Sequence, residues 1–306
     1  MFKQLLFTFS LLPGILLAEN AKCTKKCAKS CDYQLVWQDD FDYAGSEIEK
    51  KWTVMTDGKG GGNNELQYYL PSNLNTGKEP VSGTQCLIIT AQKQKYANND
   101  ATSGRLSTEG KVSFQYGKVE ARIKLPSTAN GLWPAFWLLG TDIQSVGWPA
   151  CGEIDILEMG NNYGIENNLQ DKYFNGACHW GKSYNNGAYP FFTMMNTSAY
   201  SLQDDFHLYT LYWDSTSITM YLDQDKYPDV KPYYELNTKT YNTADKAENY
   251  FNKPFFIILN LAVGGNFTRI HDINQVTALQ KGAARMYVDY VKVFQQKNQI
   301  NITQKF

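Results

Sequence analysis

Three acidic side chains within a short apolar stretch are the clearest chemical signal in the sequence. Residues 152–159 read Gly-Glu-Ile-Asp-Ile-Leu-Glu-Met, which places Glu153, Asp155 and Glu158 among apolar neighbours. Neighbouring carboxylates repel one another, so at least one should keep its proton at a raised pKa while another stays ionised. Glycoside hydrolysis needs such a division between a proton donor and a charged carboxylate. The same spacing also fits an ordinary solvated strand face paired with Lys or Arg.

The spacing of the three acids predicts an irregular strand. Side chains alternate between the two faces of a strand, so Glu153 and Asp155 share a face, while Glu158 would point to the opposite one. An unpaired carboxylate in the core is costly. One extra residue within Ile156-Leu157, forming a β-bulge, would bring all three acids to one face, and bulges are frequent beside active sites. We therefore predict a bulge at this pair.

Tryptophans lie close to the acids along the chain. Aromatic rings can stack on the C–H faces of sugars, and the indole N–H adds a polar contact. For any single tryptophan, packing in the core is the commoner role, and we assign Trp37 and Trp52 to it. Four others flank the acid segment: Trp133, Trp137, Trp148 and Trp180.

The rest of the chain has the pattern of strands. Residues 118–125 alternate between polar and apolar at every step, which indicates a strand with one solvated face. A polar turn between two β-rich runs predicts a hairpin at 207–222. Apolar runs predict further strands at 255–263 and 286–294. Helical periodicity is confined to a short candidate at 244–251, so we expect a single all-β sandwich domain.

Once these segments are placed, the sequence resembles glycoside hydrolase family 16. The resemblance rests on the acid motif and on matching segments at 35–42, 63–69, 103–106, 116–126, 133–137, 259–265 and 288–291. The six-residue form of the acid motif is similar to the laminarinase-type branch, which includes endo-β-1,3-glucanases. The resemblance implies a β-jelly-roll sandwich of two antiparallel sheets with a concave substrate cleft. It assigns 33–296 to the domain and 297–306 to a C-terminal tail.

The resemblance also implies roles for individual residues. Glu153 corresponds to the nucleophile, Glu158 to the general acid/base, and Asp155 to the carboxylate that assists between them. The substrate contacts implied by the family are Trp133, Trp137, Trp148, His179, Trp180, Asn63, Glu65 and Arg105. Glu65 and Arg105 could instead form a structural ion pair. Phe267 stands where the family commonly has a tryptophan.

No cofactor is expected to be required for catalysis. Many family members bind a structural calcium ion through an aspartate of the last strand, and Asp289 matches that position. A zinc site is not favoured, since His179, His207 and His271 are far apart in sequence.

The charge balance limits the partners. Lys and Arg number 29 against 30 Asp and Glu, a formal net charge of -1, which gives no basic excess for nucleic acid or anionic membranes. The expected partner is a neutral β-1,3-glucan, and the protein is expected to be a monomer.

The N-terminus predicts secretion. A lysine at position 3 and an apolar run at 5–17 are typical of a cleaved signal peptide, assigned to 1–18, with an uncleaved anchor as the alternative. A Cys- and Lys-rich arm follows at 19–32. Six cysteines in a secreted chain favour disulfides, and sequons at Asn196, Asn266 and Asn301 are compatible with glycosylation.

The sequence therefore predicts a secreted, endo-acting, retaining β-1,3-glucanase. One alternative is a glucan-recognition protein, because relatives with the same fold bind β-1,3-glucan after losing their catalytic acids. Another is a transglycosylase, which shares the covalent intermediate. Galactan-cleaving relatives share the bulged motif, so the linkage preference rests on the overall likeness to laminarinases.

Overall fold

The computed structural model describes residues 33–184, 188–241 and 244–305. They belong to one unit, Tyr33–Phe306. The signal peptide predicted at 1–18 and the arm at 19–32, with Cys23, Cys27 and Cys31, lie outside the described residues. None of the helices in the described chain has the length and apolar character needed to cross a membrane.

Two large antiparallel sheets form the domain. Sheet A contains, in spatial order, β16 (Tyr234–Asn237), β15 (Ser217–Leu222), β14 (His207–Trp213), β9 (Gly117–Lys124), β18 (Ala284–Gln296), β5 (Gln85–Ala91) and β4 (Leu74–Lys78), with β1 (Tyr33–Asp39) paired to β18. Sheet B contains β13 (Phe191–Thr197), β12 (Tyr173–His179), β11 (Glu153–Met159), β10 (Leu132–Gly140), β17 (Phe255–Val263), β7 (Arg105–Ser107) and β2 (Thr53–Val54), with β8 (Val112–Phe114) and β19 (Ile302–Gln304) attached.

The remaining elements are small. A parallel pair joins β3 (Gln67–Tyr69) to β6 (Ala101–Ser103). The helices are α1 (Ile48–Lys51), α2 (Ile143–Val146) and α3 (Asn162–Glu166). Single 3-10 turns occur at Gly45–Glu47, Gly60–Gly62, Pro71–Asn73, Ala247–Asn249, Ile273–Gln275 and Thr277–Leu279.

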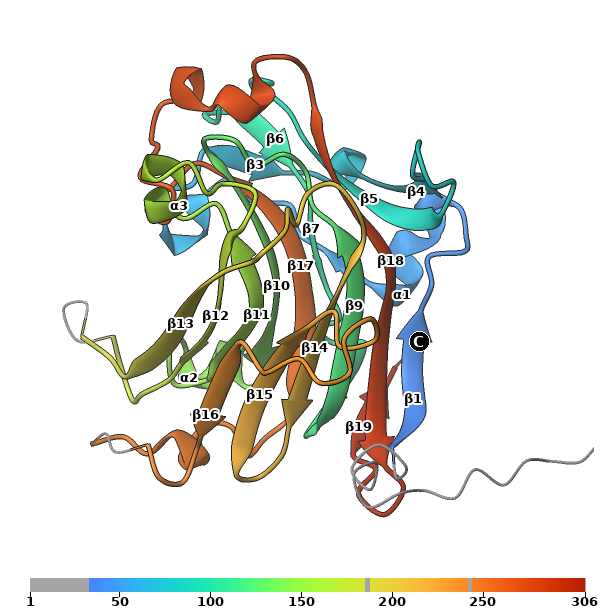
Figure 1. Ribbon diagram of the computed structural model, residues 1–306, viewed down its shortest axis with the longest axis vertical. Coiled ribbons are helices and arrows are strands. Elements are labelled where there is room, and N and C mark those ends of the chain that lie inside the picture. Colours follow the sequence, from blue (N-terminus) through green and yellow to red (C-terminus); the bar gives the residue numbers. More distant parts are fainter. Residues whose placement is uncertain (1–32, 185–187, 242–243, 306) are drawn as a thin grey trace, which may run out of the picture. The chain divides into compact units, whose positions relative to one another are not determined.

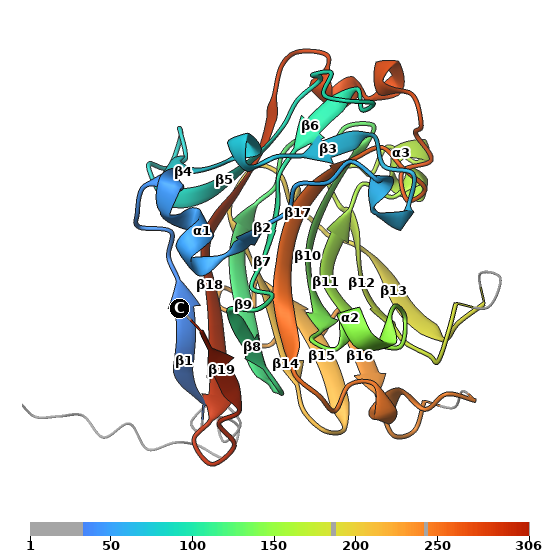
Figure 2. The same cartoon turned by 180° about the vertical axis from the view of Figure 1, so that it is seen from behind.

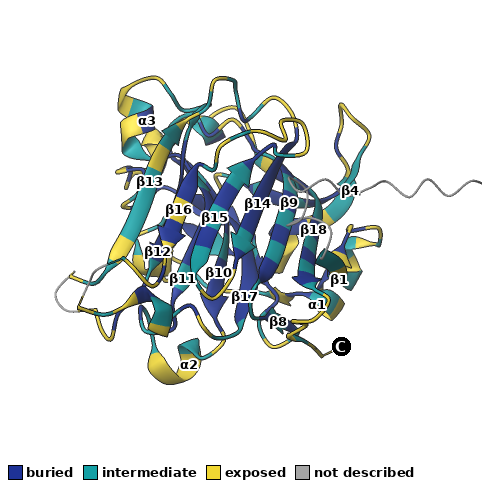
Figure 3. Cartoon of the chain, turned by 60° about the horizontal axis from the view of Figure 1, so that its bottom comes forward, coloured by how far each residue is buried: buried dark blue, intermediate teal, exposed yellow. Residues whose placement is uncertain are grey.

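The two sheets lie face to face and enclose the core. Figure 1 shows β14, β15 and β16 in front of β10 and β11, and Figure 2 shows the same layers from behind. Large side chains fill the space between the sheets, among them the fully buried Trp52 and Trp213. Figure 3 shows exposed residues on α2, on α3 and along the edge strand β13. The predicted jelly-roll sandwich is therefore confirmed.

Most predicted strands are confirmed, and their burial explains their sequence patterns. Along β9, buried and partly exposed residues alternate at every step, so the period of two reflects one core face and one solvated face. All nine residues of β17 are buried, because the core covers one face and neighbouring side chains and loops cover the other. The predicted hairpin is formed by β14 and β15.

Two predictions about elements are wrong. The helix expected at 244–251 is reduced to the turn Ala247–Asn249, because Ala247 and Phe251 enter the core and the nearby Asn249 and Pro254 are poor helix formers. The segment assigned to a tail at 297–306 contains β19, which pairs with β8. The domain therefore includes a strand beyond residue 296.

The cysteines in the described chain are free thiols. Cys86, Cys151 and Cys178 are buried and unpaired, because each occupies a core position on or beside a strand of the sandwich. The expectation of disulfides is wrong for these three residues.

Candidate active site

The predicted bulge in β11 is confirmed, and it places the three acids on one face. Asp155 pairs with Ala177 of β12 and Glu158 with Asn175, so three residue steps on β11 face two on β12. Ile156 and Leu157 are both buried in the core, and the extra residue is absorbed there. Glu153, Asp155 and Glu158 consequently point away from the core. We call this outward side of sheet B the acid face.

The register of sheet B aligns polar side chains across the acid face. Glu158 lies opposite Ala135 of β10 on one side and Asn175 of β12 on the other. The same row continues from Ala135 to Asn260 of β17 and then to Arg105 of β7. Directly paired residues of antiparallel strands project to the same face, so four of these five strands contribute a polar side chain to one row, and β10 contributes Ala135.

Glu158 is fixed through both of its carboxylate oxygens. The indole Nε1 of Trp133 donates to Oε1 at 3.1 Å, and Nδ2 of Asn175 donates to Oε2 at 2.7 Å. Trp133 in turn stacks on Phe267, with ring centroids 4.6 Å apart and planes inclined by 16°. Phe267 therefore supports the ring that orients Glu158.

Glu153 is held through one oxygen. The indole Nε1 of Trp148 donates to its Oε2 at 3.0 Å, and no described residue donates to Oε1. Trp148 itself packs on a small apolar cluster on the outward side of sheet B that includes Leu139 and Phe256. The loop after α2 thus sets the position of the Glu153 carboxylate.

Asp155 is the most buried of the three acids. It is 4% exposed, and its Oδ2 lies 3.3 Å from Nε2 of His179, without the alignment of a hydrogen bond. Among the described residues, none of the three acids forms an ion pair with Lys or Arg, so the interpretation as an ordinary charged strand face is wrong.

Burial and mutual repulsion raise the pKa of all three acids. Burial is the main cause for Glu153, whose pKa rises to about 8, and the charge of Asp155 adds most to it. The pKa of Asp155 lies well above its ordinary value because of burial and then the charge of Glu158. Burial also raises the pKa of Glu158, against the hydrogen bonds from Asn175 and Trp133 and the charge of His179.

These shifts indicate how protons are shared. Asp155 has the strongest reason to be neutral, since it is buried and its Oδ2 accepts no hydrogen bond. A neutral Asp155 removes the main repulsion acting on Glu153 and favours ionisation of Glu153. The arrangement can therefore hold one ionised and two protonated carboxyl groups on the same strand.

An aromatic cluster lies at the Glu153 end of the acid face. Tyr189 contacts the ring of Trp148, with centroids 4.6 Å apart and planes at 70°. Phe191 stacks on His179 with centroids 5.9 Å apart, and the 58% exposed Tyr184 lies beside Trp148. These rings offer partly exposed apolar surfaces next to the acids, as stacking on sugars requires.

A second polar group lies further along the acid face. Nε1 of Trp137 donates to Oδ1 of Asn260 at 2.7 Å, and the Arg105 guanidinium lies 4.8 Å from the Trp137 ring centroid. Glu65 accepts from Gln67 at 2.6 Å and from Tyr69 at 3.2 Å, and a further hydrogen bond links it to Asn63. Burial raises the pKa of Glu65, partly offset by these donors and by the charge of Arg105.

The alternative of an ion pair between Glu65 and Arg105 is not realised. No contact within 4 Å joins their charged groups in the described chain. Their side chains instead belong to the network that runs through Asn260 and Trp137, in which Asn260 Nδ2 donates to the Tyr69 hydroxyl at 3.4 Å.

Trp180 is a correction to the predicted set of substrate contacts. It is fully buried, its Nε1 donates to the backbone oxygen of Asp245 at 2.8 Å, and its ring packs edge-on against Tyr241 and Phe251. It follows His179 by one residue, so it points into the core when His179 points outward.

Asp289 lies on sheet A, away from the acids. Its Oδ2 is 2.6 Å from Nη1 of Arg122, so a calcium ion at this carboxylate would compete with a guanidinium. The structural calcium stays a prediction. Glu153, Asp155 and His179 offer ligand atoms within 4.8 Å of one another, and they are the one such group found among the described residues.

Sequence reasoning missed several residues of the acid face. Asn175 and Asn260 each interrupt an otherwise apolar or small-residue strand, and that interruption was the available signal. The rings of Tyr184, Tyr189 and Phe191 carried no such signal, because aromatic residues are common throughout this chain.

The fold and the acid face define a class. The family model described as "Glycosyl hydrolases family 16" matches residues 59–265. The chain therefore belongs to glycoside hydrolase family 16. The resemblance predicted from the motifs is confirmed, including its laminarinase-type character.

Individual relatives place the chain more narrowly. It is 33% identical over 303 residues to the Beta-glucanase of Rhodothermus marinus, with 95% of this chain and 96% of that protein covered. A Bacteroides ovatus family 16 structure, a mixed linkage glucan enzyme with its G4G4G3G product, has a TM-score of 0.73 at 39% identity and covers 85% of this chain and 100% of that one.

A laminarinase catalytic domain from Thermotoga petrophila has a TM-score of 0.68 at 32% identity, and the match covers 87% of this chain and 99% of that one. Some relatives are much longer: the chain spans 35% of the Clotting factor G alpha subunit of Tachypleus tridentatus.

Proposed function

We propose that the chain is a secreted, endo-acting, retaining glycoside hydrolase that cleaves β-1,3-glucosidic bonds in laminarin-type glucans. The observation that carries the proposal is the bulged strand β11, which presents three carboxylates on one face. Family membership and the similarity to a Beta-glucanase and a laminarinase support the substrate class.

In the first step, Glu153 acts as the nucleophile. Its free Oε1 attacks the anomeric carbon of the bound sugar while Glu158 gives its proton to the departing glycosidic oxygen. A covalent glycosyl ester on Glu153 results, and the downstream part of the glucan leaves as an alcohol. Neutral Asp155 assists by donating a hydrogen bond to Glu153.

In the second step, Glu158 reverses its role. It takes a proton from water, the hydroxide equivalent attacks the anomeric carbon, and the bond to Glu153 breaks. Retaining chemistry of this kind calls for carboxyl groups about 5–5.5 Å apart. Interception by a sugar hydroxyl instead of water would give transglycosylation by the same residues.

The neighbouring side chains support binding of a neutral chain. Partly exposed rings of Trp133, Trp137 and Trp148 flank the acids, and Asn63, Glu65 and Arg105 offer polar groups at one end of the acid face. Catalysis by these residues requires no cofactor, and a monomer suffices because all proposed site residues come from one chain.

One second candidate has specific support. The Bacteroides ovatus structure with a mixed-linkage product favours activity on β-1,3-1,4-glucans as well. A comparison of laminarin with lichenin and agarose as substrates separates the two linkage preferences and also tests galactan cleavage.

The decisive test compares the wild type with Glu153→Gln. The wild type should release reducing sugar from laminarin with retention at the anomeric carbon, seen by NMR of the first products. Glu153→Gln should bind laminarin and release none. Binding by the wild type without release across a range of pH would instead make the chain a glucan-recognition protein.

A further inference from the structure

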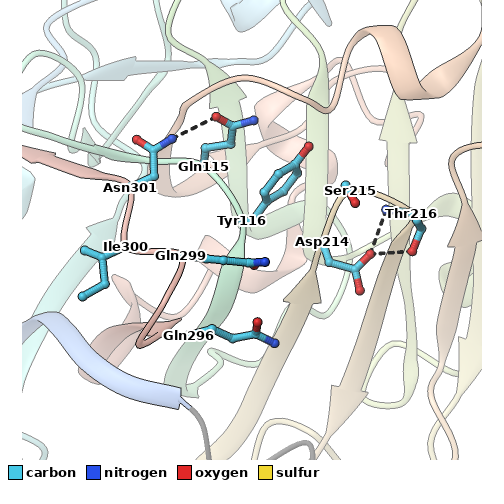
Figure 4. Close-up of a pocket in the computed structure, with 9 residues that line it drawn as sticks. All are labelled: Gln115, Tyr116, Asp214, Ser215, Thr216, Gln296, Gln299, Ile300 and Asn301. Atoms are coloured by element: carbon cyan, nitrogen blue, oxygen red, sulfur yellow. Dashed lines mark hydrogen bonds between the residues drawn. The ribbon is translucent and has the colours of Figure 1, made fainter.

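A pocket of about 630 Å³ is formed by loops at strand ends, where β8 leads to β9, β14 turns into β15 and β18 leads to β19. Gln115 and Tyr116 form one wall, the turn at 214–216 a second, and residues 296–301 a third. Figure 4 shows Gln296 and Gln299 extending towards that turn. The pocket shares no lining residue with the acid face, and its volume is within the usual range for ligand sites.

A buried glutamine joins two of the three walls of this pocket. Gln295 is 1% exposed, and its Nε2 donates to the carbonyl oxygens of Gln115 and Tyr116, both at 3.0 Å, and of Asn301 at 3.2 Å. Its Oε1 accepts from the backbone N–H of Asn301 at 2.9 Å. One amide thus joins the wall at Gln115 and Tyr116 to the wall at 296–301, which lowers the cost of ordering the site when a ligand binds.

The lining is polar and carries a single charged group. Amide and hydroxyl side chains predominate, and Asp214 is the one acid. The Asp214 carboxylate accepts from the Thr216 hydroxyl at 2.7 Å and from the Ser217 N–H at 2.9 Å. Against the effect of burial, these bonds lower its pKa. Amides and hydroxyls both donate and accept hydrogen bonds, and this chemistry suits a neutral ligand rich in hydroxyl groups.

Tyrosines continue from the pocket across sheet A. Tyr33 adjoins the pocket beside Gln296 and Tyr116, its ring meets Tyr212 with centroids 6.1 Å apart, and Tyr212 meets Tyr221 at 5.7 Å. All are partly exposed. Tyrosine offers an apolar ring and a hydroxyl on one side chain, so this line can accompany a sugar chain that leaves the pocket.

We propose that the pocket, with Tyr33 and Tyr212 at its rim, is a second, non-catalytic binding site for a neutral glucan chain. The proposal rests on the proposed function in taking the same polysaccharide as the ligand. Such a site would hold the protein on insoluble glucan while the acid face acts on another segment of the polymer. Two linked contacts raise the overall affinity for a polymer by effective concentration.

The test counts binding sites in a protein that cannot cleave its ligand. The full chain carrying Glu153→Gln is produced in a bacterial host, so that the sequon at Asn301 stays unmodified, and is titrated calorimetrically with laminarihexaose. Two sites per chain are expected. Gln299→Ala combined with Tyr212→Ala should leave one site, whereas Tyr227→Ala, an exposed tyrosine near the opposite end of β15, should leave two.

The same substitutions in the otherwise wild-type chain test the role of the pocket. Hydrolysis of soluble oligosaccharides should stay within about twofold, while binding to insoluble β-1,3-glucan should fall roughly 5–10-fold as the linked contact is lost. Ser215→Trp, which fills the pocket from an exposed turn position, is the second variant and should reproduce this loss.

The two proposals fail in different ways. One binding site in the Glu153→Gln chain, unchanged by pocket substitutions, overturns the second site and leaves the catalytic proposal intact. Retention of insoluble-glucan binding in both pocket variants overturns it as well. A wild type that releases no sugar overturns the catalytic proposal, while the titration still reports on the pocket.

Discussion

Glu153 and Glu158, the first and last acids of β11, are held differently on the acid face. Glu158 accepts a hydrogen bond at each oxygen, from Trp133 and Asn175 on the flanking strands β10 and β12. Glu153 accepts one, from Trp148 on the loop after α2. A group held at both oxygens keeps a fixed orientation, as a proton donor needs. A group held at one oxygen keeps the other free for attack, as a nucleophile needs.

The largest expected effect separates the proposed roles of these two acids. Glu153→Gln should lower the rate on laminarin by about 10⁴-fold or more, since no nucleophile is left. Glu158→Gln should lower it by about 10²–10⁴-fold, the usual contribution of general acid–base catalysis. Rates of reducing-sugar release measure both.

The leaving group provides the control for this pair. With an aryl glucoside whose leaving group needs no proton, Glu158→Gln should regain much of the first step, and Glu153→Gln should not. Equal recovery in both variants would contradict the assignment.

Asp155→Asn should have an intermediate effect. The amide keeps the size and the hydrogen-bond donor of a neutral Asp155, so we expect a loss of about 10–100-fold, within the range of general acid–base effects. Because Asp155 is already neutral when Glu153 ionises, the acid limb of the pH–rate profile should stay in place. A shift of that limb to lower pH would show that Asp155 is charged in the wild type and raises the pKa of Glu153.

The two indole donors should shift opposite limbs of the pH–rate profile. Trp148→Phe removes a hydrogen bond that lowers the pKa of Glu153, and Trp133→Phe removes one that lowers the pKa of Glu158. Trp148→Phe should shift the acid limb to higher pH, and Trp133→Phe should shift the alkaline limb to higher pH, each by about half a pH unit. Each variant should also lose about 3–10-fold in rate. Identical shifts of one limb by both variants would show that the ends are not independent.

The smallest expected effect is on stability. A carboxyl whose pKa is about 8 in the folded chain and about 4.3 when unfolded costs stability as pH rises through that window. Glu153→Gln cannot ionise, so its melting temperature should exceed that of the wild type by several degrees at pH 8 and by less at pH 5. Glu235→Gln, at an exposed position of β16, is the matched control. A difference independent of pH would contradict the raised pKa.

The sequence predicts the acid face well where local patterns determine it. The parity of Glu153, Asp155 and Glu158 along one strand is enough to predict the bulge, and alternation is enough to predict strands such as β9. The residues that surround the acids depend on the register between paired strands. Asn175 lies beside Glu158 because β12 pairs with β11. Asn260 joins the same polar row because β10 pairs with both β11 and β17.

Single positions beside a recognised site are harder to assign. His179 and Trp180 are neighbours in sequence, yet one faces the acids and the other the core. The turn at 247–249 and the strand β19 depend on packing against distant parts of the domain, which no local pattern reports.

The bulge in β11 also separates the length of the strand from the spacing of its reactive groups. Deleting Ile156 would leave a regular strand in which the three acids still alternate onto one face, because the extra residue is accommodated on the core side. This strand can therefore gain or lose a residue between the second and third acids, and so change its local bend and twist, while the order of the proposed nucleophile, assistant and acid is preserved. Such a position offers evolution, or a designer, a way to reshape the acid face without rebuilding its row of carboxylates.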